Sequence, residues 1–264
     1  MKKIGIVYFS GTGNTKFVAE NIKDVLEEYG EDADLINIEE DMINTIDYKK
    51  IIIGGPVYVD RYPEILLQFI EKNLKSFTFP VMLFTTQASD KASTAFQHCI
   101  NRFKNLNVVY CLFVTMPNNF YNFLFKMSTK EEEGVLIKKA IFFIRTGVEE
   151  FLNGNIKMYP QSKFKVKMID KVYHIIYPNC IRYLTKRINI NTEKCNECKL
   201  CERRCPAKCI KIENGVTFNT DCVFCQRCMC SCPKEAFLYK DKEIIPYKPN
   251  FRYYKRYLTG EKNN

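Results

Sequence analysis

Short apolar runs alternate with amphipathic stretches along the first half of the chain. Each run is rich in β-branched or aromatic residues and is continuous, which is typical of strands buried on both faces. Between the runs, apolar residues such as Val18, Ile22 and Val25 recur at helical spacing. Strands are expected at residues 4–9, 33–38, 51–54, 81–85 and 108–114. Five strands alternating with helices predict an α/β fold with a doubly wound, five-stranded parallel sheet.

The loop after the first expected strand has the composition of an anion-binding turn. Ligands of a doubly wound sheet sit beyond the carboxyl ends of its strands. Glycines let the backbone fold around an anion, hydroxyls donate hydrogen bonds, and the following helix adds its N-terminal dipole. The loop contains no lysine, so it does not fit a nucleoside triphosphate loop. The candidate phosphate-binding residues are Ser10, Gly11, Thr12, Gly13, Asn14 and Thr15.

Two further loops follow expected strands at the same edge of the sheet. The loop after the third strand carries a tyrosine, and the loop after the fourth strand is polar. A ligand site at this edge would use both loops, whereas the alternative is an ordinary turn with a tyrosine packed beneath it. The candidate residues are Gly55, Pro56, Val57, Tyr58, Thr86, Gln87 and Ala88.

These three loops resemble those of the flavodoxin family. The phosphate-loop motif Ser/Thr-x-Thr-Gly-x-Thr is matched at Ser10, Thr12, Gly13 and Thr15, and the resemblance covers residues 1–154. It implies FMN as a cofactor, with the first loop on its phosphate and Tyr58 stacked on the isoalloxazine ring. The chain has no tryptophan, which leaves one flavin face open, and residues 58–61 lack the glycine that commonly permits a peptide flip near flavin N5.

The cysteines are concentrated in the second half, where ten of thirteen lie between Cys195 and Cys232. Two runs have the spacing Cys-x2-Cys-x2-Cys-x3-Cys-Pro, and the second repeats the first at an offset of 27 residues. This is the spacing of bacterial ferredoxins with two [4Fe-4S] clusters, in which the fourth cysteine of each run ligates the other cluster. Tetrahedral zinc is the alternative. The predicted ligand sets are Cys195, Cys198, Cys201 and Cys232 for one cluster, and Cys222, Cys225, Cys228 and Cys205 for the second.

The repeat also bears on the cysteines that are not assigned as ligands. Cys209 aligns with Ala236, so it is predicted to be a buried packing residue, and Cys230 has no ligand counterpart. The isolated Cys99, Cys111 and Cys180 are likewise expected to pack rather than to bind metal. Short strands at 209–212, 216–218 and 236–239 complete a small α+β ferredoxin-like domain.

Length and charge indicate the same two domains as the strand pattern and the cysteine spacing. A chain of 264 residues exceeds the usual size of one domain, and we expect a flavodoxin-like domain at 1–154, a linker at 155–190, a ferredoxin-like domain at 191–245 and a basic, aromatic tail at 246–264. Residues 1–154 carry a net charge of −3 and residues 155–264 carry +13. Anionic clusters, a redox partner protein or an anionic membrane surface would compensate this excess, and no nucleic-acid recognition motif accompanies it.

The cellular location and class of activity follow from several absences in the sequence. No export signal or bilayer-spanning run is visible, so a soluble, cytoplasmic protein with reduced thiols is expected. No hydrolase or nucleophile constellation appears, and no catalytic residue is predicted. Whether the protein turns over a substrate as an enzyme stays open.

Over nearly its whole length the chain resembles the flavodoxin-ferredoxin fusion proteins of anaerobic bacteria. The resemblance implies FMN, two [4Fe-4S] clusters and an electron-transfer function with an external redox partner. Two alternatives stay open. One is a flavin-dependent reductase of a small acceptor such as a quinone, a nitro compound or a ferric chelate, and the other is a redox or iron sensor.

Overall fold

The computed structural model describes residues 2–213 and 215–251. The chain divides into two compact units. Unit 1 comprises Met1–Asn118, Ser128–Lys167 and Asn250–Asn264, and unit 2 comprises Asn119–Met127 and Met168–Pro249. The chain therefore enters unit 2 twice, first with a short segment that follows the last strand of unit 1 and then with the cysteine-rich part.

Unit 1 is built on a five-stranded parallel sheet with the order β2-β1-β3-β4-β5. The apolar runs form these strands because each run can be covered on both faces. The predicted fold class is confirmed for this unit. Strand order reverses between β1 and β3, which is the point where ligands bind in sheets of this kind. The strands are β1 (Lys3–Tyr8), β2 (Ala33–Asn37), β3 (Tyr48–Pro56), β4 (Val81–Gln87) and β5 (Val108–Thr115).

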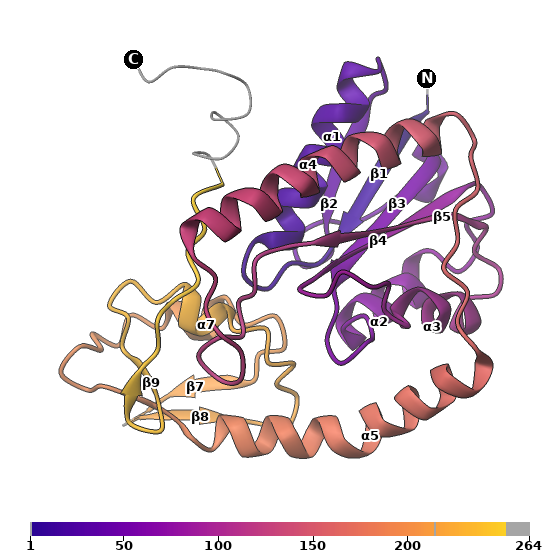
Figure 1. The fold of residues 1–264 in the computed structure, drawn as a ribbon. Helices are drawn as coiled ribbons and strands as arrows, with labels where there is room; N and C mark the ends of the chain where they lie inside the picture. Colours follow the sequence, from indigo (N-terminus) through magenta and orange to yellow (C-terminus); the bar gives the residue numbers. More distant parts are fainter. Residues whose placement is uncertain (1, 214, 252–264) are drawn as a thin grey trace, which may run out of the picture. The chain divides into compact units, whose positions relative to one another are not determined.

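Helices cover both faces of this sheet, with α1 and α4 on one face and α2 and α3 on the other (Figure 1). The face beneath α1 and α4 holds a core in which Phe17 and Ile22 of α1 and Ile144 and Val148 of α4 are buried. The helices are α1 (Asn14–Glu28), α2 (Glu64–Asn73), α3 (Ala95–Arg102) and α4 (Lys130–Leu152), and a 3-10 turn, η1 (Thr45–Asp47), precedes β3.

Helix α4 begins with a capping box. The Thr129 hydroxyl accepts a hydrogen bond from the backbone N–H of Glu132, and the Glu132 carboxylate accepts one from the backbone N–H of Thr129. These two bonds pair backbone donors that have no partner within the helix. The first turn also holds Glu131 and Glu133, whose negative charges favour the positive end of the helix dipole. The start of α4 is therefore defined by local sequence.

Unit 2 holds two small sheets, a three-stranded one with the order β10-β9-β6 and a two-stranded one formed by β7 and β8. Both sheets are antiparallel. The strands are β6 (Ile188–Ile190), β7 (Ile210–Ile212), β8 (Val216–Phe218), β9 (Phe237–Tyr239) and β10 (Lys242–Glu243), and the short helices are α6 (Leu200–Arg203) and α7 (Arg227–Cys230).

The internal repeat of the sequence is also a repeat of backbone conformation. Helices α6 and α7, and strands β7 and β9, are each separated by the same 27 residues that separate the cysteines. Left-handed residues recur at this offset as well, although none is glycine. The pairs are Glu197 with Phe224, Lys199 with Gln226, and Lys208 with Glu235, all with φ between 48° and 61°. Two cysteine runs of the same spacing thus adopt the same fold.

Helix α5 (Lys163–Thr185) occupies most of the range that the sequence suggested as a linker. A linker was expected here, but Val166, Tyr173 and Ile181 are buried at intervals that suit one face of a helix. Residues 188–190, also within the expected linker, form β6 and pair with β9. Among the helices that the structure describes, none combines the length and apolar character needed to traverse a lipid bilayer.

Candidate functional site

The carboxyl edge of the unit 1 sheet brings the three predicted loops together. The hydroxyls of Thr15 and Thr86 are 2.8 Å apart and buried, which joins the start of α1 to the end of β4. The backbone N–H of Val57 donates to the Thr86 carbonyl at 3.0 Å, which joins the loop after β3 to the same strand. The Asn14 amide donates to the Pro117 carbonyl beyond β5 at 3.1 Å. Residues from distant parts of the sequence therefore share one edge.

The loop after β1 is shaped by Ser10 and Gly13. The Ser10 hydroxyl accepts hydrogen bonds from the backbone N–H groups of Gly13 and Lys16, both at 3.2 Å. Gly13 has φ of 109°, a backbone conformation in which a residue with a side chain would be strained. It directly precedes the first residue of α1. Gly11 and Thr12 are half-buried at the rim of this turn. The loop thus presents the N-terminus of a helix, a favourable setting for an anion.

The loop after β3 forms a tight hairpin at Tyr58. The backbone N–H of Tyr58 donates to the Arg61 carbonyl at 2.8 Å, and the N–H of Arg61 donates back at 3.1 Å. Val59 and Asp60 lie between them with φ of 49° and 59°. Turns of this type usually contain Asn or Gly, because a β-branched residue such as valine is strained at positive φ. The hairpin therefore has two residues at positive φ, and neither is glycine.

Several predicted residues of the second and third loops have a structural role of their own. A Cβ on buried Gly55 would lie 2.7 Å from Leu66, so packing alone accounts for glycine there. Buried Gln87 accepts from the Thr85 hydroxyl at 3.1 Å and donates to the carbonyl of Lys91 at 2.6 Å. Its side chain therefore organises the loop that follows β4. Pro56, Val57 and Tyr58 are half-buried and Ala88 is exposed.

Phe251 is a neighbour of this edge that sequence reasoning missed. Its ring stacks on Phe17 of α1, with centroids 4.4 Å apart and planes 18° from parallel. A Cβ placed on Gly13 would lie 3.6 Å from the Phe251 ring. The sequence offered no signal for this contact, because an isolated aromatic residue in a basic tail has no pattern that identifies its partner.

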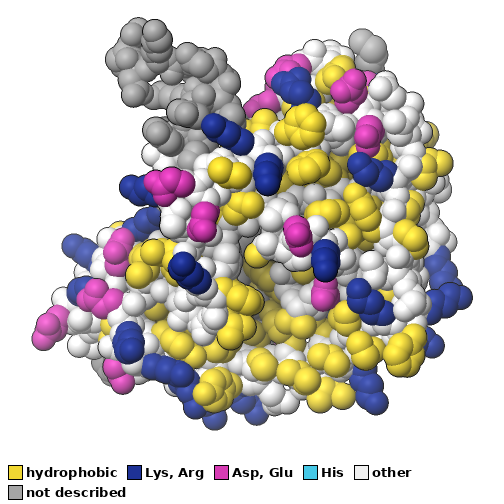
Figure 2. All heavy atoms as spheres, viewed as in Figure 1, with side chains coloured by type: hydrophobic (Ala, Val, Ile, Leu, Met, Phe, Trp, Pro, Cys, Tyr) yellow, Lys and Arg dark blue, Asp and Glu magenta, His cyan; other side chains and the backbone are white. Residues whose placement is uncertain are grey.

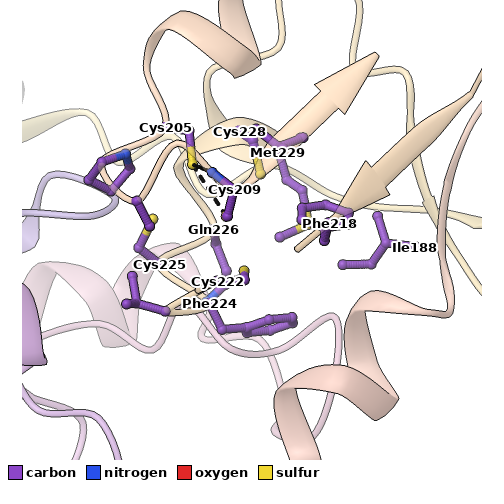
Figure 3. Close-up of a pocket in the computed structure, with 14 residues that line it drawn as sticks. Ile188, Cys205, Cys209, Phe218, Cys222, Phe224, Cys225, Gln226, Cys228 and Met229 are labelled. Carbon is purple, nitrogen blue, oxygen red and sulfur yellow. Dashed lines mark hydrogen bonds between the residues drawn. The ribbon is translucent and has the colours of Figure 1, made fainter. Parts of the chain in front are cut away.

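In unit 2 the eight motif cysteines divide between two hollows. One is lined by Cys195, Cys198, Cys201 and Cys232. The other is lined by Cys205, Cys222, Cys225 and Cys228, with Cys209 among them (Figure 3). Each hollow thus receives three cysteines from one run and the fourth cysteine from the other. The two hollows are hereafter site I and site II, in that order.

The two sites differ in how far they are covered. In site I, Glu197, Cys198 and Lys199 are exposed. Their counterparts in site II include Phe224 and Gln226, which are buried. Phe224 packs edge-to-face on Phe120 and Phe123, with centroids 5.6 and 4.9 Å away. Those two rings come from the first segment of unit 2, Asn119–Met127, which therefore covers site II.

The environment of each thiol follows from this burial. Burial raises the pKa of Cys225 to about 12 and that of Cys201 to about 11. Hydrogen bonding from the Cys209 thiol instead lowers the pKa of Cys205 and of Cys222, and so favours their thiolate forms. Any metal bound by Cys225 or Cys201 must displace a proton, which makes metal binding dependent on pH.

The backbone contributes to the two sites in parallel ways. The N–H of Cys209 donates to Cys205 Sγ at 3.3 Å, and the N–H of Ala236 donates to Cys232 Sγ at 3.5 Å. Alternation of right- and left-handed residues around each run forms concave sets of N–H groups that suit anions. Within the described residues, no three His, Cys, Asp or Glu side chains converge closely enough to hold one metal ion.

The cysteines outside the two ligand sets have varied surroundings. Cys209 is buried, as expected of a packing residue, but it lines site II rather than the interior of the fold. Cys230 is half-buried and lines neither site. Cys99 and Cys111 are buried in unit 1 and fit the prediction of packing residues. Cys180 is exposed on α5, so the expectation that it packs is wrong.

The comparisons with known proteins concern the N-terminal part of the chain. Residues 5–109 match the model of the flavodoxin domain family. Unit 1 therefore carries a flavodoxin-like domain, as its sheet order and loops predict. A search of curated protein sequences returns no match for this chain.

Solved flavoprotein structures are also similar to this part. Oxidised flavodoxin 2 from Bacillus cereus is 19% identical, with 58% of this chain and 99% of that chain covered and a TM-score of 0.42. A flavoprotein in complex with FMN from Lactobacillus acidophilus is 21% identical, with coverages of 43% and 93% and a TM-score of 0.38. Two-electron reduced flavodoxin from Megasphaera elsdenii is 18% identical, with coverages of 55% and 98% and a TM-score of 0.39.

Proposed function

We propose that this protein transfers electrons between FMN bound at the carboxyl edge of unit 1 and two [4Fe-4S] clusters bound at sites I and II, and exchanges them with an external redox protein. The observation that carries the proposal is the division of eight motif cysteines into two sets of four around two hollows. A flavodoxin-like domain in the same chain supplies the second half of the argument.

The loops of unit 1 fit the phosphate and ring of FMN. Ser10, Gly13 and the first turn of α1 form a neutral anion site, which suits a phosphomonoester held without lysine. Thr12 and Asn14 border the same turn, and Tyr58 stands at the start of the hairpin where a ring could stack. We assign the phosphate to residues 10–15 and the isoalloxazine ring to residues 55–58 and 86–88.

The cysteine sites fit cubane clusters in number, spacing and charge. Each site offers four thiols, backbone N–H donors to a ligand sulfur, and left-handed turns that suit an anion. The net charge of +13 on residues 155–264 compensates the negative charge of ligated clusters. Flavin exchanges electrons singly or in pairs and a cubane exchanges one at a time, so together they would convert between the two modes.

The exposed site is the one that an external partner can reach. Cys198 and its neighbours Glu197 and Lys199 are exposed, whereas in site II Phe224 is buried against Phe120 and Phe123 and Gln226 is buried as well. Electron transfer between proteins requires close approach of the two centres, so we assign site I to the exchange with a soluble redox protein. The reduced state of such clusters suits an oxygen-poor cytoplasm.

The first experiment is a purification under anaerobic conditions, with iron, sulfide and flavin measured on one sample. We expect about eight iron and eight sulfide per chain, from two [4Fe-4S] clusters, and one FMN. Zinc in place of iron, or failure of the protein to bind FMN at saturating concentration, would refute the proposal. Rapid mixing of the oxidised protein with a reductant of the clusters should then bleach the absorbance of the oxidised flavin, because electrons pass from the clusters to FMN.

A variant tests the assignment of ligands between the two runs. The double variant Cys195→Ser, Cys232→Ser should lose only the cluster of site I and keep about half of the iron, because crossed sets place both cysteines on that cluster. Cys230→Ser is the control, because Cys230 lies within the second run but lines neither site, and it should retain all iron. Loss of nearly all iron in the double variant contradicts the crossed ligand sets.

Turnover assays separate this function from its two alternatives. A reductase of small acceptors would oxidise the reduced protein rapidly with quinones, nitro compounds or ferric chelates, in the absence of any partner protein. A redox or iron sensor would change its oligomeric state or partner binding on cluster loss, with no steady-state turnover. Electron transfer that requires a redox protein supports the proposal made here.

We also propose that α5 contacts an anionic membrane surface. Its exposed apolar side chains Phe164, Met168, Ile175, Ile176 and Tyr183 recur at helical spacing. Exposed lysines at 163, 165, 167 and 171 accompany them, and apolar side chains gather along α5 (Figure 2). An apolar stripe flanked by lysines is the pattern of helices that lie at the surface of anionic bilayers.

Vesicle sedimentation tests this surface. The protein should bind vesicles that contain phosphatidylserine and not vesicles of phosphatidylcholine alone, and binding should weaken as salt is raised. The double variant Ile175→Ser, Ile176→Ser should lose most of the binding, whereas Val135→Ser, at an exposed apolar position on α4, should not. Absence of binding to both kinds of vesicle refutes a membrane role for α5.

A further inference from the structure

Site II contains a fifth thiol that site I does not have. Cys209 lies four residues after Cys205, and the repeat has Ala236 at the corresponding place four residues after Cys232. Both residues are buried, at 5% and 1% exposure. Cys209 lines site II and Ala236 lines site I. The two sites are therefore alike in fold, and site II has a fifth thiol where site I has a methyl group.

The geometry around Cys205 shows what this sulfur contacts. Cys209 Sγ lies 3.4 Å from Cys205 Sγ, and the backbone N–H of Cys209 donates to the same atom at 3.3 Å (Figure 3). In site I, Cys232 Sγ receives the matching backbone bond from Ala236 at 3.5 Å and has no thiol at the place of Cys209. The backbone bond is thus common to both sites, and the thiol contact is specific to site II.

We propose that Cys209 is not a ligand but a positioning residue that donates an S–H hydrogen bond to the Cys205 thiolate, and so raises the reduction potential of the site II cluster. This inference rests on the proposed function, because it assumes that Cys205 ligates a cluster. It assigns to one side chain a contribution to the potential of site II that site I lacks.

The direction of the effect follows from charge. Reduction adds one negative charge to the cluster and its thiolates, so a donor to a ligand sulfur stabilises the reduced form more than the oxidised form. Hydrogen bonds to the sulfurs are among the factors that set cluster potentials. The bond acts where Phe224 and Met229 are buried, and electrostatic interactions are stronger in such a low-dielectric setting. The Cys209 thiol should therefore make reduction of the site II cluster more favourable than it would be without this donor.

The alternative role for Cys209 is that of the fourth ligand itself. Two sulfurs 3.4 Å apart compete for one corner of a cubane, so only one of them can occupy it. Cys205 has the motif position, followed by Pro206 as Cys232 is followed by Pro233. The repeat thus favours Cys205 as the ligand and leaves the thiol of Cys209 protonated and free to donate.

The test compares Cys209→Ala with the wild-type protein, both purified anaerobically with their clusters. The substitution copies the residue of the other repeat, so the fold is expected to tolerate it. Iron and sulfide content should be unchanged, and a redox titration followed by electron paramagnetic resonance should show one of the two cluster potentials shifted to a more negative value. Cys209→Ser keeps a hydroxyl donor and should shift the same potential less.

The reciprocal variant identifies which potential belongs to which site. Ala236→Cys places a thiol beside Cys232 and should raise the other cluster potential, with both clusters retained. If Cys209→Ala loses half of its iron, Cys209 is a ligand and the proposal is wrong. If both potentials are unchanged in Cys209→Ala, the thiol donates no bond of consequence and the proposal is equally wrong.

The same measurements keep this inference separate from the proposed function. A wild-type protein without iron and sulfide overturns the proposed function, and the inference with it. A wild-type protein with two clusters, but with potentials that do not respond to Cys209, overturns the inference alone.

Discussion

Some residues at the sheet edge are required by packing although they lie in or next to a loop assigned to ligand binding. A Cβ on Gly54 would lie 1.9 Å from the Phe84 ring, and a Cβ on Gly55 would lie 2.7 Å from Leu66. Gly54 precedes the loop assigned to the flavin ring, and Gly55 is the first residue of that loop. Their absence of side chains is required by the core beneath the sheet, whether or not a ligand is bound above it.

Substitution of Gly54 by Ala tests this explanation. The added methyl would overlap the buried Phe84 ring, which must move, and overpacked cores lose ~1–3 kcal/mol of unfolding free energy. Urea denaturation should show the loss. Gly30→Ala measures backbone strain alone, because nothing lies within 4 Å of its Cβ position and its φ of 78° strains a side chain. A Gly54 variant as stable as the wild-type protein would contradict a steric role for Gly54.

Buried cysteines have different roles in the two units. Cys99 and Cys111 are buried in unit 1, and burial raises the pKa of each to about 12, so they are inert packing groups. Cys209 is also buried, but a motif sulfur lies 3.4 Å away. Burial alone therefore does not distinguish a packing thiol from one that modifies a site.

Helices and strands differ in how much of their position is set locally. Helix α4 begins with a capping box at Thr129 and Glu132, whereas α5 has a single capping bond, from the backbone N–H of Lys165 to the Ser162 hydroxyl. The residues that α5 buries decide which of its faces packs on the protein. The five strands of unit 1 agree with the apolar runs, because a run covered on both faces needs no alternation.

Replacement of Thr129 by Ala tests the local signal of α4. The substitution removes the hydroxyl that accepts the Glu132 N–H and should cost about 1 kcal/mol of unfolding free energy. Thermal or urea unfolding of unit 1 measures the change. Thr220→Ala, at an exposed position outside any helix or strand, is the control and should be near neutral. A Thr129 variant as stable as the control would show that packing alone defines the helix start.

Net charge is distributed unevenly along the whole molecule. Residues 1–154 carry a net charge of −3 and residues 155–264 carry +13. A basic unit that carries the proposed clusters should attract an acidic redox partner over a distance of about 10 Å, the screening length at ordinary salt.

The rate of electron transfer should depend on salt in a way that reports this attraction. The second-order rate constant with an acidic acceptor protein should fall steeply as ionic strength rises, because screening removes the steering. An uncharged acceptor of similar potential is the control, and its rate should change little. Stopped-flow measurements of flavin or cluster oxidation give both values. A rate with the acidic acceptor that is independent of salt contradicts electrostatic steering by the basic unit.

The sequence by itself determined the α/β sheet of unit 1 and the candidate residues at its edge, because burial on both faces and a glycine-rich turn leave direct marks on local composition. The cysteine spacing also predicted the division of eight cysteines between two hollows, because it matches that of ferredoxins in which the fourth cysteine of each run ligates the other cluster.

Only the tertiary structure decided which residues from distant parts of the chain lie together. The Phe251 ring beside Gly13, the cover of site II by Phe120 and Phe123, and the thiol of Cys209 next to Cys205 all depend on it. None has a periodic pattern in sequence, because such contacts are selected by the shape of the folded chain and not by neighbours along it.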